Sequence, residues 1–227
     1  MTRHSVQGIY AVVDPRFLPA GRDVAEFTRA FLDGGGRLVQ LRVKDAGPAL
    51  SAERRRLADA IMALKNEYDF TFVMNDDVAG ARAVAADGVH VGQDDPPISV
   101  VRATLGSDLL IGYSAHTVAE AVTAAAAGAD YVALGAIYPT ATKGPGHPVQ
   151  GVTVLRHVVQ AVHIPVVAIG GITRANVDTV WQAGAAAVAM ITGLTQAADV
   201  RAETQWHVRA WEQWQSSHTR CTDRSVA

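Results

Sequence analysis

The stretch Phe70-Thr71-Phe72-Val73-Met74 is an almost wholly apolar run that stops at the polar cluster Asn75-Asp76-Asp77. A helix-like segment over residues 78–86 follows, and a second run, Gly88-Val89-His90-Val91, stops at Gly92-Gln93-Asp94-Asp95. Strands buried on both faces of a parallel sheet read as continuous apolar runs, because helices cover each side. The stretch therefore predicts a strand–helix–strand unit with carboxylates at the same end of both strands.

The same alternation continues in both directions and predicts a single α/β domain. Strands are expected over the apolar, β-branched runs 9–13, 38–41, 70–74, 88–91, 109–112, 131–134, 166–169 and 187–190. Helices are expected over the Ala-rich amphipathic segments 24–32, 49–66, 78–86, 98–105, 118–127, 152–162 and 175–182. Eight such units without a break in composition predict a closed (β/α)8 TIM barrel, a fold of about 250 residues, close to the 227 of this chain.

A doubly wound open sheet is the alternative architecture for this alternation. It predicts a Gly-rich phosphate-binding turn after the first strand, but the first run here ends Val13-Asp14-Pro15. The barrel instead places phosphate-binding loops and the active site at the carboxyl ends of its strands. We expect the barrel domain to span residues 1–214, with a last helix over 200–214, and residues 215–227 to form a polar, disordered tail.

Composition argues against several classes of function. The 20 Lys and Arg residues nearly balance 22 Asp and Glu, so no surface for nucleic acid is expected. The single cysteine, Cys221, excludes a disulfide framework and a Cys-rich metal site. No unbroken apolar stretch reaches the roughly 20 residues of a membrane span, and the first residues do not form a signal peptide. We expect a cytoplasmic enzyme with no nucleic-acid or membrane partner; the sequence leaves open whether it is a homo-oligomer.

Polar side chains at the end of the run 38–41 predict an anion site. The sequence there is Gln40-Leu41-Arg42-Val43-Lys44, and residues 40, 42 and 44 share one face of an extended chain. An Arg guanidinium offers a planar fork for phosphate, and a Lys ammonium offers a point charge. A solvated loop would explain Lys44 alone, but not polar groups at Gln40 and Arg42 on a buried strand.

The acidic clusters predict a Mg²⁺ site beside these cations. Carboxylate oxygens are the ligands that Mg²⁺ takes together with substrate phosphates. Asp77 directly precedes residues 78–86 and is explained as a helix N-cap, which leaves Asp76 as the metal ligand and Asn75 as a substrate contact. Asp95 precedes two prolines and could itself be a cap. The residues alone therefore do not decide whether Asp94 or Asp95 is the second Mg²⁺ ligand.

A second anion site is expected across the barrel mouth. The segment Thr140-Ala141-Thr142-Lys143 supplies two hydroxyls and an ammonium, and the Gly/Pro-rich residues 144–148 are interpreted as a flap. Gly170-Gly171 and Ile191-Thr192 follow the last two strands, where this fold binds phosphate through backbone N–H groups. Ser114 could also donate to a phosphate. Two phosphorylated ligands, or one long one, are therefore expected.

Six motifs, in order and each at a strand end, resemble the thiamine-phosphate synthase family. They are Gln40-Leu41-Arg42-Val43-Lys44, Asn75-Asp76-Asp77, Gly92-Gln93-Asp94-Asp95, Ser114-Ala115-His116-Thr117, the segment 135–143, and Gly170-Gly171-Ile172. The resemblance implies a Mg²⁺-dependent transferase of thiamine biosynthesis. It would condense 4-amino-5-hydroxymethyl-2-methylpyrimidine diphosphate with 4-methyl-5-(2-phosphoethyl)thiazole, or its 2-carboxy form. Thiamine phosphate and diphosphate would form by a dissociative mechanism through a pyrimidine carbocation.

The resemblance also assigns roles to residues of this chain. The pyrimidine diphosphate would be held by Gln40, Leu41, Arg42, Val43, Lys44 and Asn75, together with Ser114 and Lys143. The thiazole phosphate would be held by Thr140, Ala141, Thr142, Gly171, Ile191 and Thr192. The Mg²⁺ ligands would be Asp76 and Asp95, which decides between Asp94 and Asp95. The catalytic groups would be Arg42, Lys44, Ser114 and Lys143, which stabilise the leaving diphosphate.

Two departures and three rival functions accompany the resemblance. The family often has Lys where this chain has Gly144 and Ser where it has Thr192, changes that we expect to tune affinity. A thiazole tautomerase or regulator on the same barrel, or a non-catalytic binding protein, has no use for a full set of diphosphate and metal ligands. A sugar-phosphate epimerase predicts paired acid and base residues facing each other across the barrel.

Overall fold

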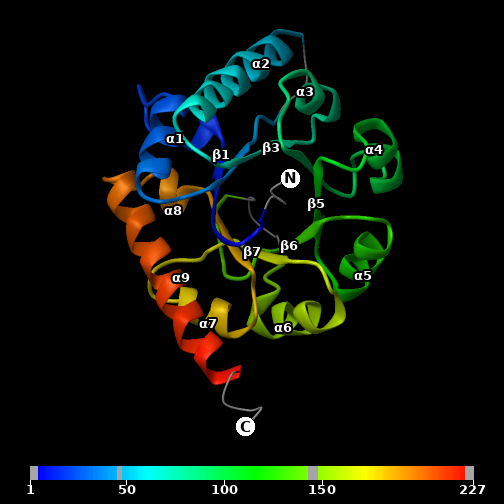
Figure 1. Cartoon of the computed structure of the whole chain (residues 1–227), viewed down its shortest axis with the longest axis vertical. Helices are drawn as coiled ribbons and strands as arrows, with labels where there is room; N and C mark the ends of the chain where they lie inside the picture. The colour runs from blue at the N-terminus through cyan, green and yellow to red at the C-terminus, as the bar shows by residue number, and fades with distance from the viewer. Residues whose placement is uncertain (1–4, 45–47, 143–147, 223–227) are drawn as a thin grey trace.

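The structure, a computed structural model, describes residues 5–44, 48–142 and 148–222, of which 48–50 and 218–222 only by their backbone. Within these residues eight parallel strands close into a barrel in sequence order (Figure 1). The strands are β1 (Gly8–Val13), β2 (Leu38–Leu41), β3 (Thr71–Asn75), β4 (Gly88–Val91), β5 (Leu110–Ala115), β6 (Tyr131–Gly135), β7 (Val166–Ile169) and β8 (Ala187–Met190). The predicted (β/α)8 barrel is confirmed.

Helices surround the barrel and connect its strands (Figure 1). The α-helices are α1 (Val24–Asp33), α2 (Pro48–Ala63), α3 (Val78–Ala83), α4 (Ile98–Leu105), α5 (Val118–Ala126), α6 (Gly151–Ala161), α7 (Val177–Gln182), α8 (Thr192–Thr195) and α9 (Val200–Thr222), and the 3-10 helices are η1 (Pro15–Phe17) and η2 (Leu64–Asn66). Across the described residues, no helix combines the length and the apolar character that crossing a lipid bilayer requires.

Most element limits agree with the sequence prediction to within one or two residues, and three of the differences are larger. β5 continues to Ala115, because Ser114 and Ala115 still pair with β6. α3 ends at Ala83, shortly before Ala85 turns into the left-handed region with φ 55°. The last helix, expected to end at residue 214, continues as α9 to Thr222, so the expected disordered tail is helical over its described part. Residues 223–227 lie outside the described residues.

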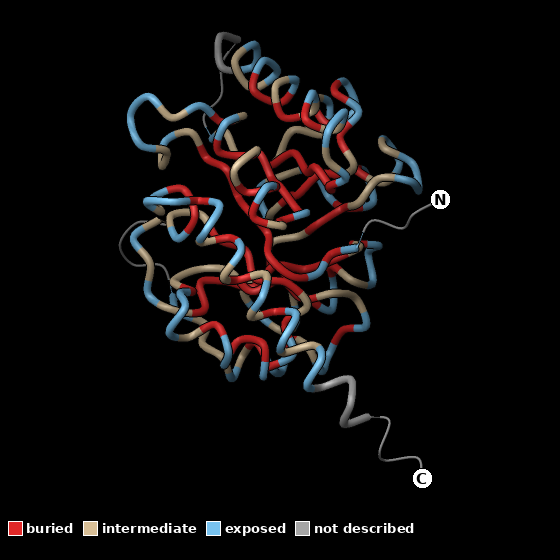
Figure 2. Tube along the Cα trace, turned by 60° about the vertical axis from the view of Figure 1, so that its left-hand side comes forward, coloured by how far each residue is buried: buried red, intermediate tan, exposed pale blue. Residues whose placement is uncertain are grey.

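Buried residues gather in the middle of the molecule, on the strands and on the helix faces toward them (Figure 2). Their side chains form two layers, one inside the barrel and one between the strands and the helices. The inner layer includes Tyr10, Leu38, Val73, Tyr131 and Val167. Alternate residues of each strand point to opposite faces, so the same strands fill both layers. Inward-facing polar groups at the strand ends therefore lie at the barrel mouth. Inward-facing polar groups in the middle of the strands lie in the barrel interior.

The C-terminal helix α9 closes the outer shell against the first strand. Trp211 of α9 lies 4.5 Å from Trp181 of α7 and 5.3 Å from Trp214, measured between ring centroids. A Cβ at Gly8, the first residue of β1, would lie 3.3 Å from the Trp211 ring. The tryptophans near the C-terminus therefore pack α9 against α7 and the amino end of β1, at the opposite end of the barrel from the predicted site.

Strand register brings the predicted site residues to one end of the barrel. Val13 of β1 is level with Leu41 of β2, and Leu41 is level with Met74 of β3. Asn75 is in turn level with His90 of β4. The residues that follow these positions, Asp14, Arg42 and Asp76 among them, therefore share one mouth of the barrel.

Candidate active site

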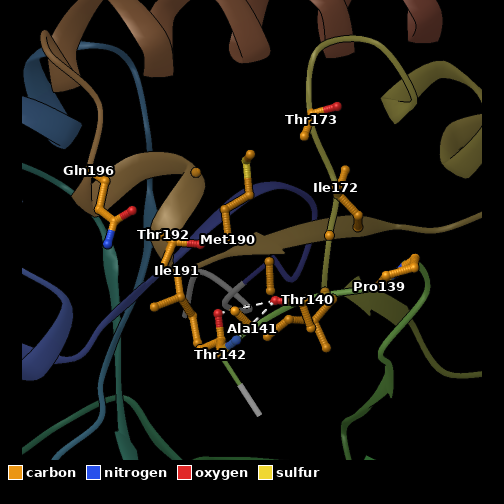
Figure 3. Close-up of a pocket in the computed structure, with 15 residues that line it drawn as sticks. Pro139, Thr140, Ala141, Thr142, Ile172, Thr173, Met190, Ile191, Thr192 and Gln196 are labelled. Atoms are coloured by element: carbon orange, nitrogen blue, oxygen red, sulfur yellow. Dashed lines mark hydrogen bonds between the residues drawn. The ribbon is translucent and has the colours of Figure 1, made fainter. Parts of the chain in front are cut away.

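Two adjoining cavities occupy the carboxyl end of the barrel. The first, of about 430 Å³, is lined by residues from the strand ends of β1 to β5, including Gln40, Arg42, Lys44, Asn75, Asp76, Asp94, Asp95 and Ser114. The second, of about 400 Å³, is lined by residues near β6 to β8, including Thr140, Ala141, Gly171 and Thr192 (Figure 3). Thr142, Ile169, Ala189 and Ile191 line both. The two expected anion sites are thus neighbours with a shared wall.

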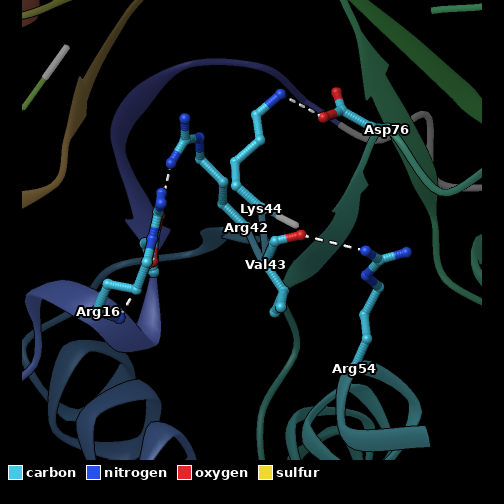
Figure 4. Close-up of polar contacts among 7 residues, drawn as sticks. Arg16, Arg42, Val43, Lys44, Arg54 and Asp76 are labelled. Carbon is cyan, nitrogen blue, oxygen red and sulfur yellow. Dashed lines mark hydrogen bonds and ion pairs between the residues drawn. The ribbon is translucent and has the colours of Figure 1, made fainter. Parts of the chain in front are cut away.

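Alternate residues at the end of β2 line the first cavity, as the sequence predicted. Gln40 is buried and donates from Nε2 to the Tyr10 hydroxyl at 2.8 Å. Lys44 Nζ contacts Asp76 Oδ2 at 2.5 Å (Figure 4). Leu41 and Val43, which point the other way, line neither cavity: Leu41 belongs to the layer between strands and helices. Their described side chains pack against the helices, which leaves only their backbone to approach a ligand.

Asp14, a residue without a role in the sequence prediction, holds Arg42. Its fully buried carboxylate accepts from Arg42 Nη1 at 2.5 Å and from the Arg16 side chain at 2.7 and 3.0 Å. Burial alone raises the pKa of Asp14, but the hydrogen bonds from Arg16 and Arg42 outweigh it and hold the pKa below its usual value. Asp14 therefore remains charged and fixes the Arg42 guanidinium at the cavity wall.

Asp76 and Asp95 meet at the rim of the first cavity. Asp76 adopts φ 62°, a left-handed conformation that Asp tolerates better than most residues, while its N–H donates to His90 O at 2.8 Å. Asp95 Oδ2 accepts from the backbone N–H of Gly92 at 2.7 Å. Burial raises the pKa of Asp95, and the neighbouring Asp76 carboxylate, within hydrogen-bonding reach, raises it further. Two carboxylates in this position are a suitable place for a cation.

Backbone contacts test the expected cap at Asp77 and the cap role left open for Asp95. Asp77 accepts from Gly80 N–H at 2.8 Å, so its prediction as the N-cap of α3 is confirmed. The N-cap of α4 is Pro97, so the Asp95 side chain does not cap that helix. Asp94 is exposed and also lines the first cavity. Within the described residues, no group of three or more His, Cys, Asp or Glu side chains forms a metal site by itself.

Asn75 and Ser114 present polar groups to the first cavity. Asn75 is buried, and its Nδ2 has no hydrogen-bond partner among the described residues. An unpaired buried amide is costly, so a ligand acceptor at this position would stabilise it. Ser114 Oγ lies 2.9 Å from Nε2 of the buried His90, a residue that sequence reasoning treated only as part of a strand. Ser114 is therefore held by a side chain from the neighbouring strand.

The second cavity is built from hydroxyls and glycine backbone. Thr140 Oγ1 accepts from the Thr142 backbone N–H at 3.3 Å, and the two hydroxyls lie 3.2 Å apart. Gly171 has φ 66°, and a Cβ there would lie 2.5 Å from Pro139 O, so only glycine fits. Thr192, at the other wall, begins α8. Lys143 and the flap residues 144–147 lie outside the described residues.

Comparison with known proteins is consistent with this geometry. The sequence profile of the family described as "Thiamine monophosphate synthase" matches residues 9–194, from β1 to α8. The chain belongs to the thiamine monophosphate synthase family. The matched region contains every residue that lines the two cavities except Gln196. The family assignment therefore rests on the part of the chain that builds the site.

Individual members of the thiamine monophosphate synthase family resemble the chain over most of its length. It is 45% identical over 182 residues to the thiamine-phosphate synthase of Geobacillus kaustophilus, covering 80% of this chain and 82% of the relative. It is 41% identical to that of Shouchella clausii, over 90% and 96% of the two chains. The solved thiamine phosphate pyrophosphorylase of Pyrococcus furiosus superposes with a TM-score of 0.81 at 35% identity, over 92% and 96% of the two chains. The chain is therefore an enzyme of the transferase class.

Proposed function

We propose that this protein joins 4-amino-5-hydroxymethyl-2-methylpyrimidine diphosphate to 4-methyl-5-(2-phosphoethyl)thiazole, giving thiamine phosphate and diphosphate; the 2-carboxy form of the thiazole would give the same products together with CO₂. The observation that supports this most directly is the pair of cavities with a shared wall. One carries Arg42, Lys44 and two carboxylates, a set suited to a metal-bound diphosphate. The other offers hydroxyls and glycine backbone, a set suited to a phosphate monoester.

The proposed cofactor is Mg²⁺, held by Asp76 and Asp95. Mg²⁺ is usually bound by one or two carboxylates together with water and substrate phosphates, which agrees with a pair of acidic residues rather than a larger cluster. The raised pKa of Asp95 reflects burial and the nearby Asp76 charge, a repulsion that a cation would relieve. When bound, Mg²⁺ would neutralise charge that develops on the leaving diphosphate.

The residues of the first cavity would assist departure of the diphosphate. In the proposed dissociative reaction the bond between the pyrimidine methylene carbon and the diphosphate oxygen breaks, and its electron pair leaves with the oxygen. The thiazole nitrogen then donates its lone pair to the carbocation and forms the new C–N bond. Arg42, fixed by Asp14, and Lys44, whose side chain is 44% exposed, would stabilise the departing charge. Lys143 is proposed to contribute in the same way.

Positioning groups would orient the pyrimidine and the thiazole. Asn75 Nδ2, unpaired among the described residues, and the Ser114 hydroxyl would donate to the pyrimidine diphosphate, and Gln40 would contact the ring. Thr140, Thr142 and the backbone at Gly171 would hold the thiazole phosphate. Because the two cavities share a wall, the thiazole nitrogen would be held close to the pyrimidine methylene carbon that it attacks.

A reconstitution assay tests the proposal. Purified protein is incubated with both phosphorylated precursors and Mg²⁺, and thiamine phosphate and diphosphate are expected in equal amounts; chelation of the metal is expected to stop the reaction. Folded protein that yields no thiamine phosphate from either thiazole would refute the proposed function. Product from thiazole isomerisation without condensation would instead identify a tautomerase. The cytoplasmic location remains a prediction.

A further inference from the structure

A series of hydrogen bonds crosses the barrel along the wall of the first cavity. Gln40 Nε2 donates to Tyr10 Oη at 2.8 Å, and Tyr10 Oη lies 2.9 Å from Tyr131 Oη. Tyr131 Oη lies 3.0 Å from His90 Nδ1, and His90 Nε2 lies 2.9 Å from Ser114 Oγ. The five residues come from five different strands. The first and last of them, Gln40 and Ser114, are predicted ligand contacts. We call these five residues the relay.

The two tyrosines in the relay act as hydroxyls with one proton each. Burial raises the pKa of Tyr10 and Tyr131 well above the usual value, so both stay protonated at neutral pH. Tyr10 Oη accepts from the Gln40 amide at one end of the relay. Between the two tyrosine hydroxyls, and between Tyr131 and His90, either partner can donate. The relay can therefore run in either direction without leaving a polar atom unpaired within it.

The imidazole of His90 holds Ser114 whichever way the relay runs. If Nδ1 accepts from Tyr131, Nε2 donates to Ser114 Oγ; in the reverse direction Ser114 Oγ donates to Nε2. In both cases the Ser114 hydroxyl lies 2.9 Å from the ring nitrogen, at the wall of the first cavity.

The barrel interior leaves room for this geometry at one glycine. A Cβ at Gly112 of β5 would lie 2.3 Å from Tyr131 Oη and 2.4 Å from His90 Nδ1. Any larger residue would therefore separate the hydroxyl from the imidazole. His90 also stacks on Tyr131, with ring centroids 5.5 Å apart and an interplanar angle of 30°, which fixes the ring plane.

We propose that His90 is a positioning residue: its imidazole, held by Tyr131, fixes the Ser114 hydroxyl at the wall of the first cavity. Its effect on catalysis rests on the proposed function, because it acts through a residue assigned to the pyrimidine diphosphate. The contact between His90 and Ser114 does not rest on that function.

The first test reads the two contacts of the His90 ring. Protein labelled with ¹⁵N-histidine is examined by long-range ¹H–¹⁵N correlation, and the His90 signals are assigned by their absence in His90→Asn. Because each ring nitrogen has its own partner, Ser114→Ala should shift mainly the Nε2 signal and Tyr131→Phe mainly the Nδ1 signal. An Nε2 signal that is unchanged in Ser114→Ala would overturn the proposal.

The second test separates positioning from simple support of the fold. The Gln amide in His90→Gln can reach the place of Nε2 and donate to Ser114, whereas Asn in His90→Asn reaches only the place of Nδ1. We expect His90→Asn to lower kcat about tenfold and His90→Gln to recover most of that loss. The exposed His157→Asn on α6 is the matched control and should leave kcat unchanged.

A double-mutant cycle completes the test. If His90 acts through the Ser114 hydroxyl, His90→Asn should cost no more than about twofold in the Ser114→Ala background. An equal loss in both backgrounds, or a loss of folding stability in place of kcat, would overturn the positioning role. If the unmodified protein makes no thiamine phosphate, the proposed function fails, while the ¹⁵N measurement still decides whether His90 holds Ser114 as described.

Discussion

Asp77 makes two separable contacts, and replacing it by Ala or by Asn distinguishes them. Its carboxylate accepts from Gly80 N–H at 2.8 Å and pairs with Arg54 Nη1 at 3.1 Å. An N-cap is worth about 1 kcal/mol. The pair adds about 1 kcal/mol, the upper part of the range for accessible pairs, because its side chains are only 23% and 18% exposed. Asp77→Ala should therefore cost about 2 kcal/mol of unfolding free energy, and Asp77→Asn, which keeps the cap, about 1 kcal/mol.

Urea unfolding and steady-state kinetics measure the two predictions together. With a dependence of about 3 kcal/mol per molar urea, Asp77→Ala should lower the midpoint by about 0.7 M and Asp77→Asn by about half as much. Neither variant should change kcat by more than about twofold, because Asp77 is not in contact with the first cavity. Asp59→Ala, which breaks an exposed pair with Arg55 on α2, is the control and should cost less than about 0.5 kcal/mol. Equal destabilisation by both Asp77 variants would refute the cap, and a tenfold loss of kcat at unchanged stability would place Asp77 in the chemistry.

Three further changes probe the two cavities. Asp76→Ala should abolish Mg²⁺-dependent turnover but leave thiazole-phosphate binding, measured by calorimetry, largely intact; equal loss of both would contradict two separate anion sites. Asp14 has a lowered pKa, so its stabilisation is complete above its unfolded pKa of about 4 and is lost as pH falls through the lower folded value. Asp14→Asn should thus reduce the loss of unfolding free energy at acid pH, and it should lower kcat by releasing Arg42. An unchanged loss of stability at acid pH would show that the Asp14 charge does not stabilise the fold. Gly171→Ala should raise the KM for the thiazole phosphate more than that for the pyrimidine, since its Cβ would clash with Pro139 O; equal effects would place Gly171 outside the thiazole site.

The barrel could be predicted from the sequence because buried parallel strands are apolar throughout and stop abruptly at polar residues. Those stops, at Gln40 to Lys44 and at Asn75 and Asp76, mark both the strand ends and the site. The Asp77 cap is likewise a local signal, an acceptor followed at once by a helix. Features encoded within a few neighbouring residues are therefore predictable from the amino-acid sequence alone.

Contacts between distant strands are not predictable in this way. Asp14 is a single acidic residue before a proline, and its partner Arg42 is 28 positions away. Tyr10 and Tyr131 are separated by 121 positions, and each resembles an ordinary aromatic residue of an apolar strand. His90, within the run 88–91, gives no local sign that both ring nitrogens find partners. Side-chain pairing across the barrel depends on closure and register, which no short stretch of sequence specifies.

The placement of α9 against β1 has a consequence for the order of biosynthesis. α9 contributes no described residue to either cavity, yet it covers β1, which carries Tyr10 and leads into Asp14. β1 is synthesised before the other seven strands of the barrel, whereas its neighbours β8 and α9 are synthesised after β7. The site residues carried by β1 to β7 and the loops that follow them are therefore made before β8 can close the barrel. A protein truncated before Val200 should be inactive through failure to complete the fold, although it retains all the residues proposed for the chemistry.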